Sequence, residues 1–531
     1  MGVEDDDSGG AVVPSQHCPH LSRLNLDPNL LQWNMPCQRC GSHSENWTCL
    51  GCYSSFCSRY VSGHFLEHSH DQSLDGMHAI GISSSDLSVW CHSCQSYIKH
   101  ATLLPILCRA ERLKFGGNLG APVVSGQPIR TAVILQYLEA DAHAHPTSRR
   151  RLEGPARVYP ICPFLDAHST ALSECLCLPS VEAVPADLEG LHSPAYVSAL
   201  VAGRLLPEQE RCGPADVYLT PASGRVALQA AGSCAALGRL IARSAASTEG
   251  SPAAVRNGFA LVRPPGHHAE ADRAVGFCLL NNVAVAVRAI QDELRRCHPT
   301  GISGTSADGT ARVLVVDWDL HHGNGIQRMF YEDPSVLYIS VHRYEHAPGL
   351  FYSAEGALDR RGAGPGLGFN VNVPLPYPRS DPRRGYCDAD YRYIFQRVVL
   401  PLGRAYRPAA VVVACGFDAA EGDPTARDDD IPSDDPGARP AAQKKSLFHL
   451  TPRLYGELTR TLMAGIPSAQ GRLLAVLEGG YQGEANALCA NQVLMSLVHP
   501  EEGDSPASSE APLLETTSLV GQVLALGWLF S

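Results

Sequence analysis

The sequence predicts an α/β domain built on a parallel sheet, preceded by a small domain rich in cysteine and histidine. From about residue 125 to 500, short β-branched apolar runs alternate with helical patterns. This alternation is typical of a parallel sheet with helices on both faces. Eight of the 19 cysteines lie within the first 94 residues, and nine histidines lie within the first 100. A chain of 531 residues has room for both domains.

Bulk composition excludes several classes of protein. The chain is 44% apolar and 18% charged, as is usual for a globular protein, and its formal net charge is −12. This charge argues against direct, non-specific binding of nucleic acid. No apolar run reaches membrane-spanning length, and the N-terminal "MGVEDDDSGG" lacks the features of a signal peptide. We therefore expect a cytoplasmic and/or nuclear protein without a membrane partner.

The chain divides by composition into five segments. Residues 1–16 are polar and acidic, which predicts a disordered N-terminus. Residues 17–100 form the Cys/His-rich block, and 101–125 read as a short helix followed by a Gly/Pro-rich linker. Residues 126–500 form the α/β domain, and 501–531 are a C-terminal tail. The apolar run "SLVGQVLALGWLFS" in this tail predicts a packed or partner-binding helix.

Within the α/β domain, five short runs are nearly continuously apolar, as strands buried on both faces are. They are "RNGFALVRPPGHH", "ARVLVVDWD", "SVLYISVHR", "AAVVVACGFD" and "RLLAVLEGGY". Helices are expected in "NNVAVAVRAIQDELRR" and "DYRYIFQRVVLPLGRAY". Two stretches rich in Gly, Ser, Asp and Pro, at 298–312 and 425–446, predict loop insertions.

The Cys/His-rich block has the ligand spacing of zinc sites. Three C-x-x-C pairs occur within 58 residues, and each can place two thiolates on one tetrahedral zinc. With neighbouring histidines and single cysteines the block offers twelve ligands, enough for three closed, structural sites. His70 is an alternative to His68 or His78 as a ligand. Unrelated reduced cysteines are the competing interpretation, which the repeated pairing disfavours.

The stretch "VLVVDWDLHHGNG" concentrates metal-binding residues after an apolar run. In a strand, Asp317, Asp319 and His321 point to one face, so Asp319 and His321 can bind one metal, with Asp317 behind them. His322 points to the other face and reads as a core histidine. Asp418 ends another apolar run and is the natural third ligand, because the carboxyl ends of parallel strands gather functional groups.

Four strand ends carry candidate residues in this way, since His267 and His268 follow one run and Tyr481 follows another. Three protein ligands leave one coordination position open, as catalytic zinc requires for its water. A neighbouring imidazole can then take the proton of that water.

Five long motifs lie in residues 190–495. They are "FALVRPPGHHAEADRAVGFCLLNNVAVA", "VLVVDWDLHHGNGIQRMFYEDPSVLYISVHR", "GAGPGLGFNVNVPLP", "CGFDAAEGDP" and "LEGGY". These motifs resemble those of the class II zinc-dependent histone deacetylases. The resemblance implies an arginase/deacetylase-like three-layer domain around an eight-stranded parallel sheet. It also implies hydrolysis of N6-acetyl-lysine in acetylated proteins such as histones or tubulin, with one catalytic zinc.

The same resemblance implies a role for each site residue. Asp319, His321 and Asp418 would hold the catalytic zinc. His268 would be the general base and then the general acid, oriented by Asn324, and His267 would act electrostatically, held by Asp317. Tyr481 would donate its hydroxyl to the reacting carbonyl. The remaining implied residues are Gly276, Phe277 and Phe351 or Tyr352 in the lysine slot, and Asp317, His321 and Ser340 at a monovalent cation site, with potassium as the candidate ion.

The Cys/His-rich block resembles the ubiquitin-binding zinc finger (UBP-type) of ubiquitin proteases in "ENWTCLGCYSSFCSRYVSGHFLEH" and "DLSVWCHSCQSYI". The resemblance implies three structural zincs, held by Cys18, His20, Cys91 and Cys94; by Cys37, Cys40, Cys57 and His64; and by Cys49, Cys52, His68 and His78. It also implies a pocket for the C-terminal tail of ubiquitin, made by Trp47, Arg59, Tyr60, Trp90 and Tyr97. The competing interpretation is that these aromatic residues only cover a small core.

Two other functions remain open from the sequence. An acetylpolyamine amidohydrolase would share the same catalytic residues. A catalytically defective ubiquitin-binding adaptor would follow if the atypical segment 126–185 does not complete the fold. In that segment, Val133 to Tyr137 are the expected first strand.

Overall fold

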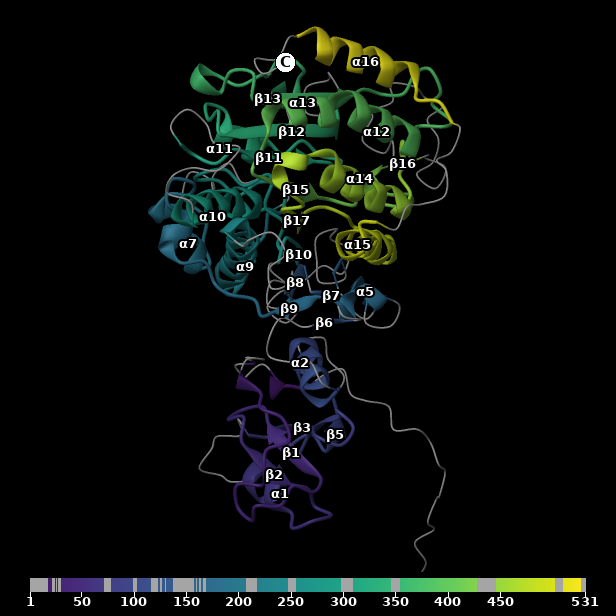
Figure 1. Cartoon of the computed structure of the whole chain (residues 1–531). Coiled ribbons are helices and arrows are strands. Elements are labelled where there is room, and N and C mark those ends of the chain that lie inside the picture. Colours follow the sequence, from purple (N-terminus) through teal and green to yellow (C-terminus); the bar gives the residue numbers. More distant parts are fainter. Residues whose placement is uncertain are drawn as a thin grey trace, which may run out of the picture. The chain divides into compact units, whose positions relative to one another are not determined.

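A computed structural model of the chain divides into two compact units, Met1–Val123 and Val124–Ser531 (Figure 1). The structure describes residues 18–21, 24, 26, 30–70, 78–98, 103–115, 123–124, 127–128, 130–136, 157–158, 160–161, 164–165, 169–206, 217–246, 255–297, 309–344, 354–426, 446–501 and 510–526. The predicted disordered N-terminus 1–16, Phe351, Tyr352 and most of both predicted loop insertions lie outside these residues.

The small unit is built on a five-stranded antiparallel sheet with the order β2-β1-β3-β4-β5. Its elements are β1 (Asn46–Cys49), β2 (Ser55–Cys57), β3 (Ile80–Ser83), β4 (Val89–Cys91), β5 (Ser96–Tyr97), α1 (His64–Ser69) and α2 (Leu104–Phe115). Helix α1 lies against the sheet at Gly81, where a side chain would overlap the ring of Phe65. The buried apolar cluster is small and includes Leu50, Ile82 and Ile106, so little apolar surface stabilises this unit.

The large unit contains an eight-stranded sheet in which every neighbouring pair of strands is parallel. The order is β13-β12-β11-β15-β17-β10-β8-β9. The strands are β8 (Thr131–Leu135), β9 (Leu176–Leu178), β10 (Asn257–Leu261), β11 (Val313–Asp317), β12 (Val336–Arg343), β13 (Asn370–Leu375), β15 (Ala410–Cys415) and β17 (Leu473–Leu477). All five predicted apolar runs are strands, and the expected first strand forms two residues earlier than predicted.

Helices cover both faces of this sheet, and its strands are therefore buried on both sides. On one face, Val313 and Val315 of β11 join the apolar cluster that includes α9 (Ser223–Arg243) and α10 (Asn282–Cys297). On the other face, Leu314 lies against Gly403 of α13 (Leu400–Tyr406). The alternation of side chains along a strand therefore builds the predicted three layers.

The remaining described α-helices and strands range from two to 16 residues in length. They are α5 (Thr170–Ser173), α6 (Pro185–Leu188), α7 (Pro194–Val201), α11 (Asn324–Phe330), α12 (Asp388–Ile394), α14 (Pro452–Gly465), α15 (Gly483–Val498), β6 (Val123–Val124), β7 (Gln127–Pro128), β14 (Tyr386–Cys387) and β16 (Phe448–His449). A π-helical turn, Phe395–Val399, joins α12 to α13 just before Pro401, which lacks the N–H of a regular helix. Among the described helices, none combines the length and apolar character needed to cross a membrane.

Helix α16 (Leu514–Ala525) lies in the segment assigned to a C-terminal tail, and it packs against β13 at one edge of the sheet (Figure 1). Fully buried Asp390 anchors it, because its Oδ1 accepts hydrogen bonds from the Leu513 amide and from the Thr516 hydroxyl, both at 2.7 Å. The Asp390 Oδ2 lies 2.9 Å from an Arg384 guanidinium nitrogen. The described part of the apolar C-terminal run, through residue 526, therefore belongs to a packed helix, one of the two predicted forms.

Candidate catalytic and zinc-binding sites

The candidate catalytic residues converge at the carboxyl ends of four neighbouring strands. His267 and His268 follow β10, Asp319 and His321 follow β11, Asp418 follows β15, and Tyr481 follows β17. These strands are contiguous in the sheet, in the order β11-β15-β17-β10. Groups more than 200 positions apart in sequence therefore meet, as where Glu478 accepts from the amide of Gly266 at 2.6 Å.

Asp319 and His321 are aligned by a turn and not by the strand that the sequence predicted. Strand β11 ends at Asp317, two residues before the first predicted ligand. Beyond it, the amide of Asp319 donates to Asp317 Oδ1 at 3.2 Å, and the amide of His321 donates to Asp319 Oδ1 at 2.9 Å. A carboxylate that accepts a hydrogen bond from the amide two residues later in the chain stabilises a turn. These two hydrogen bonds, and not a strand, therefore position Asp319 and His321.

The residues present fit a zinc ion. Asp319 and Asp418 are fully buried carboxylates, and their oxygens lie with a His321 ring nitrogen within 4.8 Å of one another. Oxygen and imidazole donors of this kind bind zinc, and a cation offsets the high cost of buried negative charge. Burial raises the pKa of Asp418 to about 7 when no cation balances it. Gly416 and Gly479 make room for the carboxylates, because a Cβ at either would overlap Asp319.

His267 is held as a cation among carboxylates. Its Nδ1 lies 3.2 Å from Asp317 Oδ2, which also accepts from the Tyr338 hydroxyl at 2.8 Å. Its Nε2 lies 3.7 Å from Asp319 Oδ1. Burial opposes the charge on His267, but Asp319 and Asp317 outweigh it and raise its pKa to about 10. The neighbouring carboxylates therefore favour the protonated, positively charged form of His267.

His268 is kept neutral by its surroundings. Burial lowers its pKa well below the ordinary value, and the nearby charges of His267 and His321 act in the same direction. Its Nδ1 lies 2.8 Å from Asn324 Oδ1, so the ring proton stays on Nδ1. Nε2 then carries a lone pair and can accept a proton.

Phe277 and Tyr481 face each other beside this site. Gly276 and Phe277, at φ 53° and 64°, form a two-residue turn closed by reciprocal hydrogen bonds between Val275 and Cys278. A left-handed backbone is rare for a bulky residue and marks a constrained, often functional, position. The Phe277 and Tyr481 rings are edge-to-face with centroids 5.8 Å apart. Burial raises the pKa of the Tyr481 hydroxyl well above its ordinary value, so it remains a proton donor.

Sequence reasoning missed Arg157, Glu478 and Asp423 in this region. Buried Arg157 donates from Nε to the carbonyl of Gly480 at 2.6 Å, and its guanidinium stacks 5.0 Å from the centre of the Tyr481 ring. Asp423 accepts from the Tyr481 amide at 2.6 Å. Arg157 belongs to the atypical segment 126–185, and a single arginine outside any recognised motif gives no signal of such a contact.

Two further predicted residues, Ser340 and His322, have different outcomes. Ser340 lies opposite Asp317 in the ladder of β12 and β11, and its hydroxyl lies 2.8 Å from His342 Nδ1. A monovalent cation between Asp317, His321 and Ser340 stays a prediction. His322 is buried as expected, with its Nε2 3.1 Å from Gln327 Oε1.

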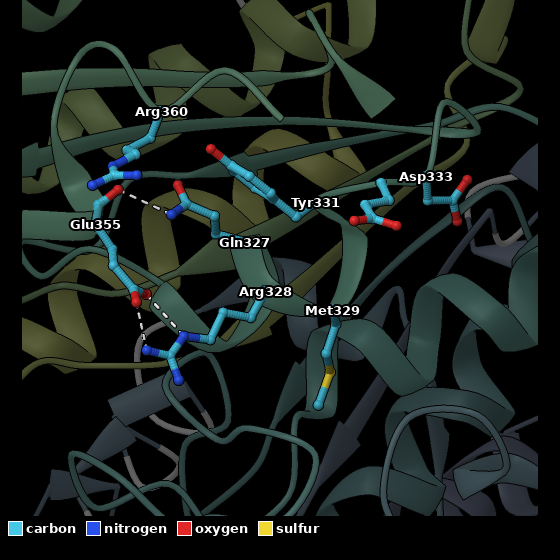
Figure 2. Close-up of a pocket in the computed structure, with 8 residues that line it drawn as sticks. Gln327, Arg328, Met329, Tyr331, Asp333, Glu355 and Arg360 are labelled. Atoms are coloured by element: carbon cyan, nitrogen blue, oxygen red, sulfur yellow. Dashed lines mark hydrogen bonds and ion pairs between the residues drawn. The ribbon is translucent and has the colours of Figure 1, made fainter. Parts of the chain in front are cut away.

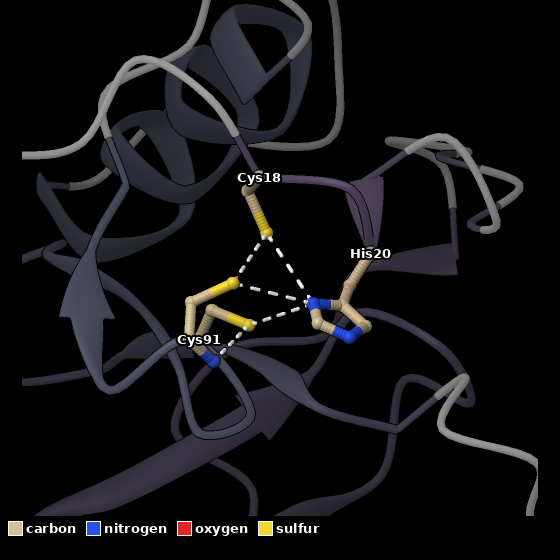
Figure 3. A group of neighbouring side chains, drawn as sticks. Cys18, His20 and Cys91 are labelled. Carbon is tan, nitrogen blue, oxygen red and sulfur yellow. Dashed lines mark hydrogen bonds between the residues drawn. The ribbon is translucent and has the colours of Figure 1, made fainter.

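In the small unit, the twelve predicted zinc ligands gather into the three predicted groups. Figure 3 shows the first, where His20 Nδ1 lies 3.3 Å from the Cys94 thiol and 3.5 Å from the Cys91 thiol. A tetrahedron with zinc–ligand distances of about 2.0–2.3 Å has edges of about 3.5 Å, so these spacings suit zinc. In the third group His78 lies 3.0 Å from His68, whereas His70 ends helix α1 with its side chain exposed.

Three of the predicted ubiquitin-binding aromatics share one face of the antiparallel sheet. Trp47 pairs with Ser83, Gly81 pairs with Trp90, and Trp90 pairs with Tyr97. Residues directly opposite each other share a face, as do residues two apart in a strand. Arg59 and Tyr60 follow β2, both exposed, with the Arg59 guanidinium donating to the Tyr60 hydroxyl at 2.7 Å.

Two protein families match this chain. "Histone deacetylase domain" matches residues 151–497, and "Zn-finger in ubiquitin-hydrolases and other protein" matches residues 37–103. The crystal structure of the HDA15 HD domain superimposes with a TM-score of 0.57 at 32% identity, covering 75% of this chain and 93% of that one.

Curated relatives carry the same family name. Histone deacetylase 15 of Arabidopsis thaliana is 34% identical over 412 residues, which are 77% of this chain and 62% of the relative. Histone deacetylase HDA1 of Saccharomyces cerevisiae is 38% identical over 276 residues, 51% of this chain and 33% of the relative. Histone deacetylase 7 of Homo sapiens is 40% identical over 255 residues, 47% and 23% of the two chains. The chain thus spans less than two thirds of the length of each of these relatives.

Proposed function

The chain belongs to the histone deacetylase family, and on this basis we propose that it hydrolyses N6-acetyl-lysine in histones or other proteins to lysine and acetate. The convergence of two carboxylates, an imidazole, a neutral histidine and a tyrosine hydroxyl at the ends of four adjacent strands carries the proposal. Asp319, His321 and Asp418 are the residues that would hold the catalytic zinc. When bound, zinc supplies a Lewis acid that polarises the amide carbonyl and acidifies water.

In this proposal His268 moves the proton. Its neutral Nε2 accepts a proton from the attacking water and then returns it to the leaving lysine amine. The Nδ1–H keeps its bond to Asn324 Oδ1, 2.8 Å away, in both steps. The positive charge of His267 favours the negative charge that develops on the substrate.

Tyr481 and Phe277 orient the substrate. The Tyr481 hydroxyl, held protonated by its raised pKa, donates a hydrogen bond to the carbonyl oxygen as that oxygen becomes negative. The Phe277 ring forms one wall for the apolar stem of the acetyl-lysine, a role supported by its edge-to-face contact with Tyr481.

Turnover by the purified full chain, with its zinc content measured, tests this proposal. Release of acetate from an acetyl-lysine peptide is compared with release from an acetylated polyamine. We expect the peptide to be the better substrate and Tyr481→Phe to lower kcat by about 10²-fold or more. Preference for the polyamine would identify an acetylpolyamine amidohydrolase. No turnover of either substrate with zinc bound would identify a defective, binding-only protein.

We further propose that the small unit binds the free C-terminal tail of ubiquitin. Trp90 and Tyr97 support this proposal, because their half-buried rings lie edge-to-face with centroids 4.8 Å apart, and aromatic walls suit an extended glycine backbone. The exposed Arg59 guanidinium is suited to pair with a carboxylate.

Binding of ubiquitin to the full chain tests this second proposal. We expect ubiquitin with a free C-terminal carboxylate to bind at least tenfold more tightly than ubiquitin with an amidated C-terminus, measured by calorimetry. Arg59→Ala should remove most of this difference. Equal affinity for the two ubiquitin forms would refute carboxylate capture.

A further inference from the structure

The amide of Asn324 has two possible orientations, and the choice decides which nitrogen of His268 can act as a base. With Oδ1 toward His268, the ring proton lies on Nδ1 and Nε2 is free. With Nδ2 toward His268, the amide donates, the ring proton moves to Nε2, and the base is blocked. An aspartate at position 324 would not face this choice, because both of its oxygens accept.

Glu270 selects the productive orientation. Its Oε1 accepts a hydrogen bond from Asn324 Nδ2 at 3.0 Å, shorter than the 3.5 Å bond that Nδ2 also donates to the carbonyl oxygen of His268. A carboxylate only accepts hydrogen bonds, so it fixes the NH₂ group on its own side and leaves Oδ1 for His268. The Glu270 side chain is 14% exposed, so water competes little for this contact.

Arg328 holds Glu270 in place and lies one helical turn after Asn324 on helix α11. Asn324 and Arg328 are four residues apart on α11, so their side chains lie on one face of the helix. The Arg328 guanidinium forms an ion pair with Glu270 Oε2. It also forms an ion pair with Glu355, and its Nε lies 2.9 Å from Glu355 Oε2 (Figure 2). Arg328 and Glu355 line an open cavity, which places the outer end of this chain of contacts near solvent.

We propose that Glu270 is a positioning residue for the general base: it orients the Asn324 amide and thereby sets the tautomer of His268, with Arg328 as its support. This inference rests on the proposed deacetylase function. It predicts that the loss of kcat caused by removing the Glu270 carboxylate depends on the residue at position 324. A glutamate with a merely structural role would matter equally whichever residue lies there.

A double-mutant cycle on acetyl-lysine peptide turnover tests this dependence. We expect Glu270→Ala to lower kcat by about 10- to 100-fold, with KM changed by less than about twofold. In an Asn324→Asp background, the same change should alter kcat by less than about threefold, since no amide remains to be oriented. Arg328→Met leaves the Glu270 carboxylate in place as the acceptor for Asn324, so its loss of kcat should lie between these two effects. Glu182→Ala removes an exposed, ion-paired glutamate and is the matched control.

The tautomer itself gives a readout that does not depend on turnover. Nitrogen-15 NMR of the full chain labelled at histidine, with His268 assigned by its absence in His268→Ala, distinguishes a protonated Nδ1 from a protonated Nε2. We expect Nδ1–H in the wild type and a shift toward Nε2–H in Glu270→Ala.

An unchanged tautomer in Glu270→Ala, or an equal loss of kcat in both backgrounds, overturns the proposal. If the wild type turns over no substrate, the deacetylase proposal fails, and the NMR measurement still decides the role of Glu270. If Asn324→Asp is inactive, the NMR measurement again decides.

Discussion

The small unit and the large unit hold their metal-ligating residues in different ways. In the small unit the cysteines and histidines of each group lie mainly against one another, around a limited apolar cluster. In the large unit the backbone already holds the carboxylates. Asp319 accepts from the amide of Gly479 at 2.7 Å, and Asp418 accepts from the amide of Leu320 at 2.7 Å.

This difference separates two uses of a metal. Where the chain supplies little buried apolar surface, metal binding and folding are one process. Where an eight-stranded sheet positions the ligands, we expect the fold to persist when the ion is removed. The following changes break or sharpen this contrast, and they run from the largest expected effect to the smallest.

Removal of zinc with a chelator should affect the two units most differently. We expect amide protons of β3 and β4 to lose their protection from exchange, because the three ligand groups lose their charge balance. Amides of β11, β15 and β17 should stay protected. Hydrogen exchange read by mass spectrometry measures both. Persistent protection of β3 after confirmed zinc loss would contradict the contrast.

Substitution of a single metal ligand should show the same contrast with a smaller effect on each unit. Cys52→Ser should remove one finger zinc and weaken ubiquitin binding at least tenfold, because its group loses a thiolate. Asp319→Asn should lower deacetylase turnover by about 10²-fold or more while the large unit stays folded. Zinc content, turnover and circular dichroism separate the two outcomes. An unfolded large unit in Asp319→Asn would show that its ligands are structural too.

Glycine substitutions probe how each unit is packed. In Gly479→Ala the new methyl group would overlap the carboxylates of Asp319 and Asp418. We expect a loss of zinc affinity and turnover of about 10- to 100-fold. In Gly81→Ala the methyl group meets only the end of the Phe65 ring, so the finger should lose about 1–3 kcal/mol of stability, as overpacked cores do. A fully active Gly479→Ala would show that the carboxylates are free to move.

Exposed ion pairs should not distinguish the units at all. Arg225 and Glu182 pair on the large unit, and Arg39 and Glu67 pair on the small one, with every side chain at least 42% exposed. Alanine at either glutamate should shift the unfolding temperature by less than about 2 °C, because exposed pairs contribute little. Differential scanning calorimetry measures both shifts. A shift above about 5 °C in one unit would require a further contact there.

The sequence predicted the parallel sheet, its layers and the family, because long apolar runs and motifs are local signals. It also predicted the residues that meet as ligand groups, since C-x-x-C pairs and strand-end carboxylates carry their chemistry in their spacing. Strand β9 was not predicted, because it is only three residues long and lies in a segment without a recognisable motif.

Other features depended on contacts between distant parts of the chain. Arg157 reaches the carbonyl of Gly480 across 323 positions, which no local pattern encodes. The turn that aligns Asp319 with His321 depends on side-chain acceptors that a strand pattern does not distinguish. The placement of His78 beside His68, and of His70 at the end of helix α1, depends on a helix boundary that sequence patterns locate poorly.

Helix α16 has a consequence for the solubility of shortened forms of this chain. It packs against β13, which among the described strands has a neighbour on one side only, and Asp390 is buried beneath the first turn of α16. A chain truncated after residue 500 would expose an apolar sheet edge, and Asp390 would lose two hydrogen-bond donors. Bare edges recruit other chains, so such a form should aggregate where one extending through residue 526 stays dispersed.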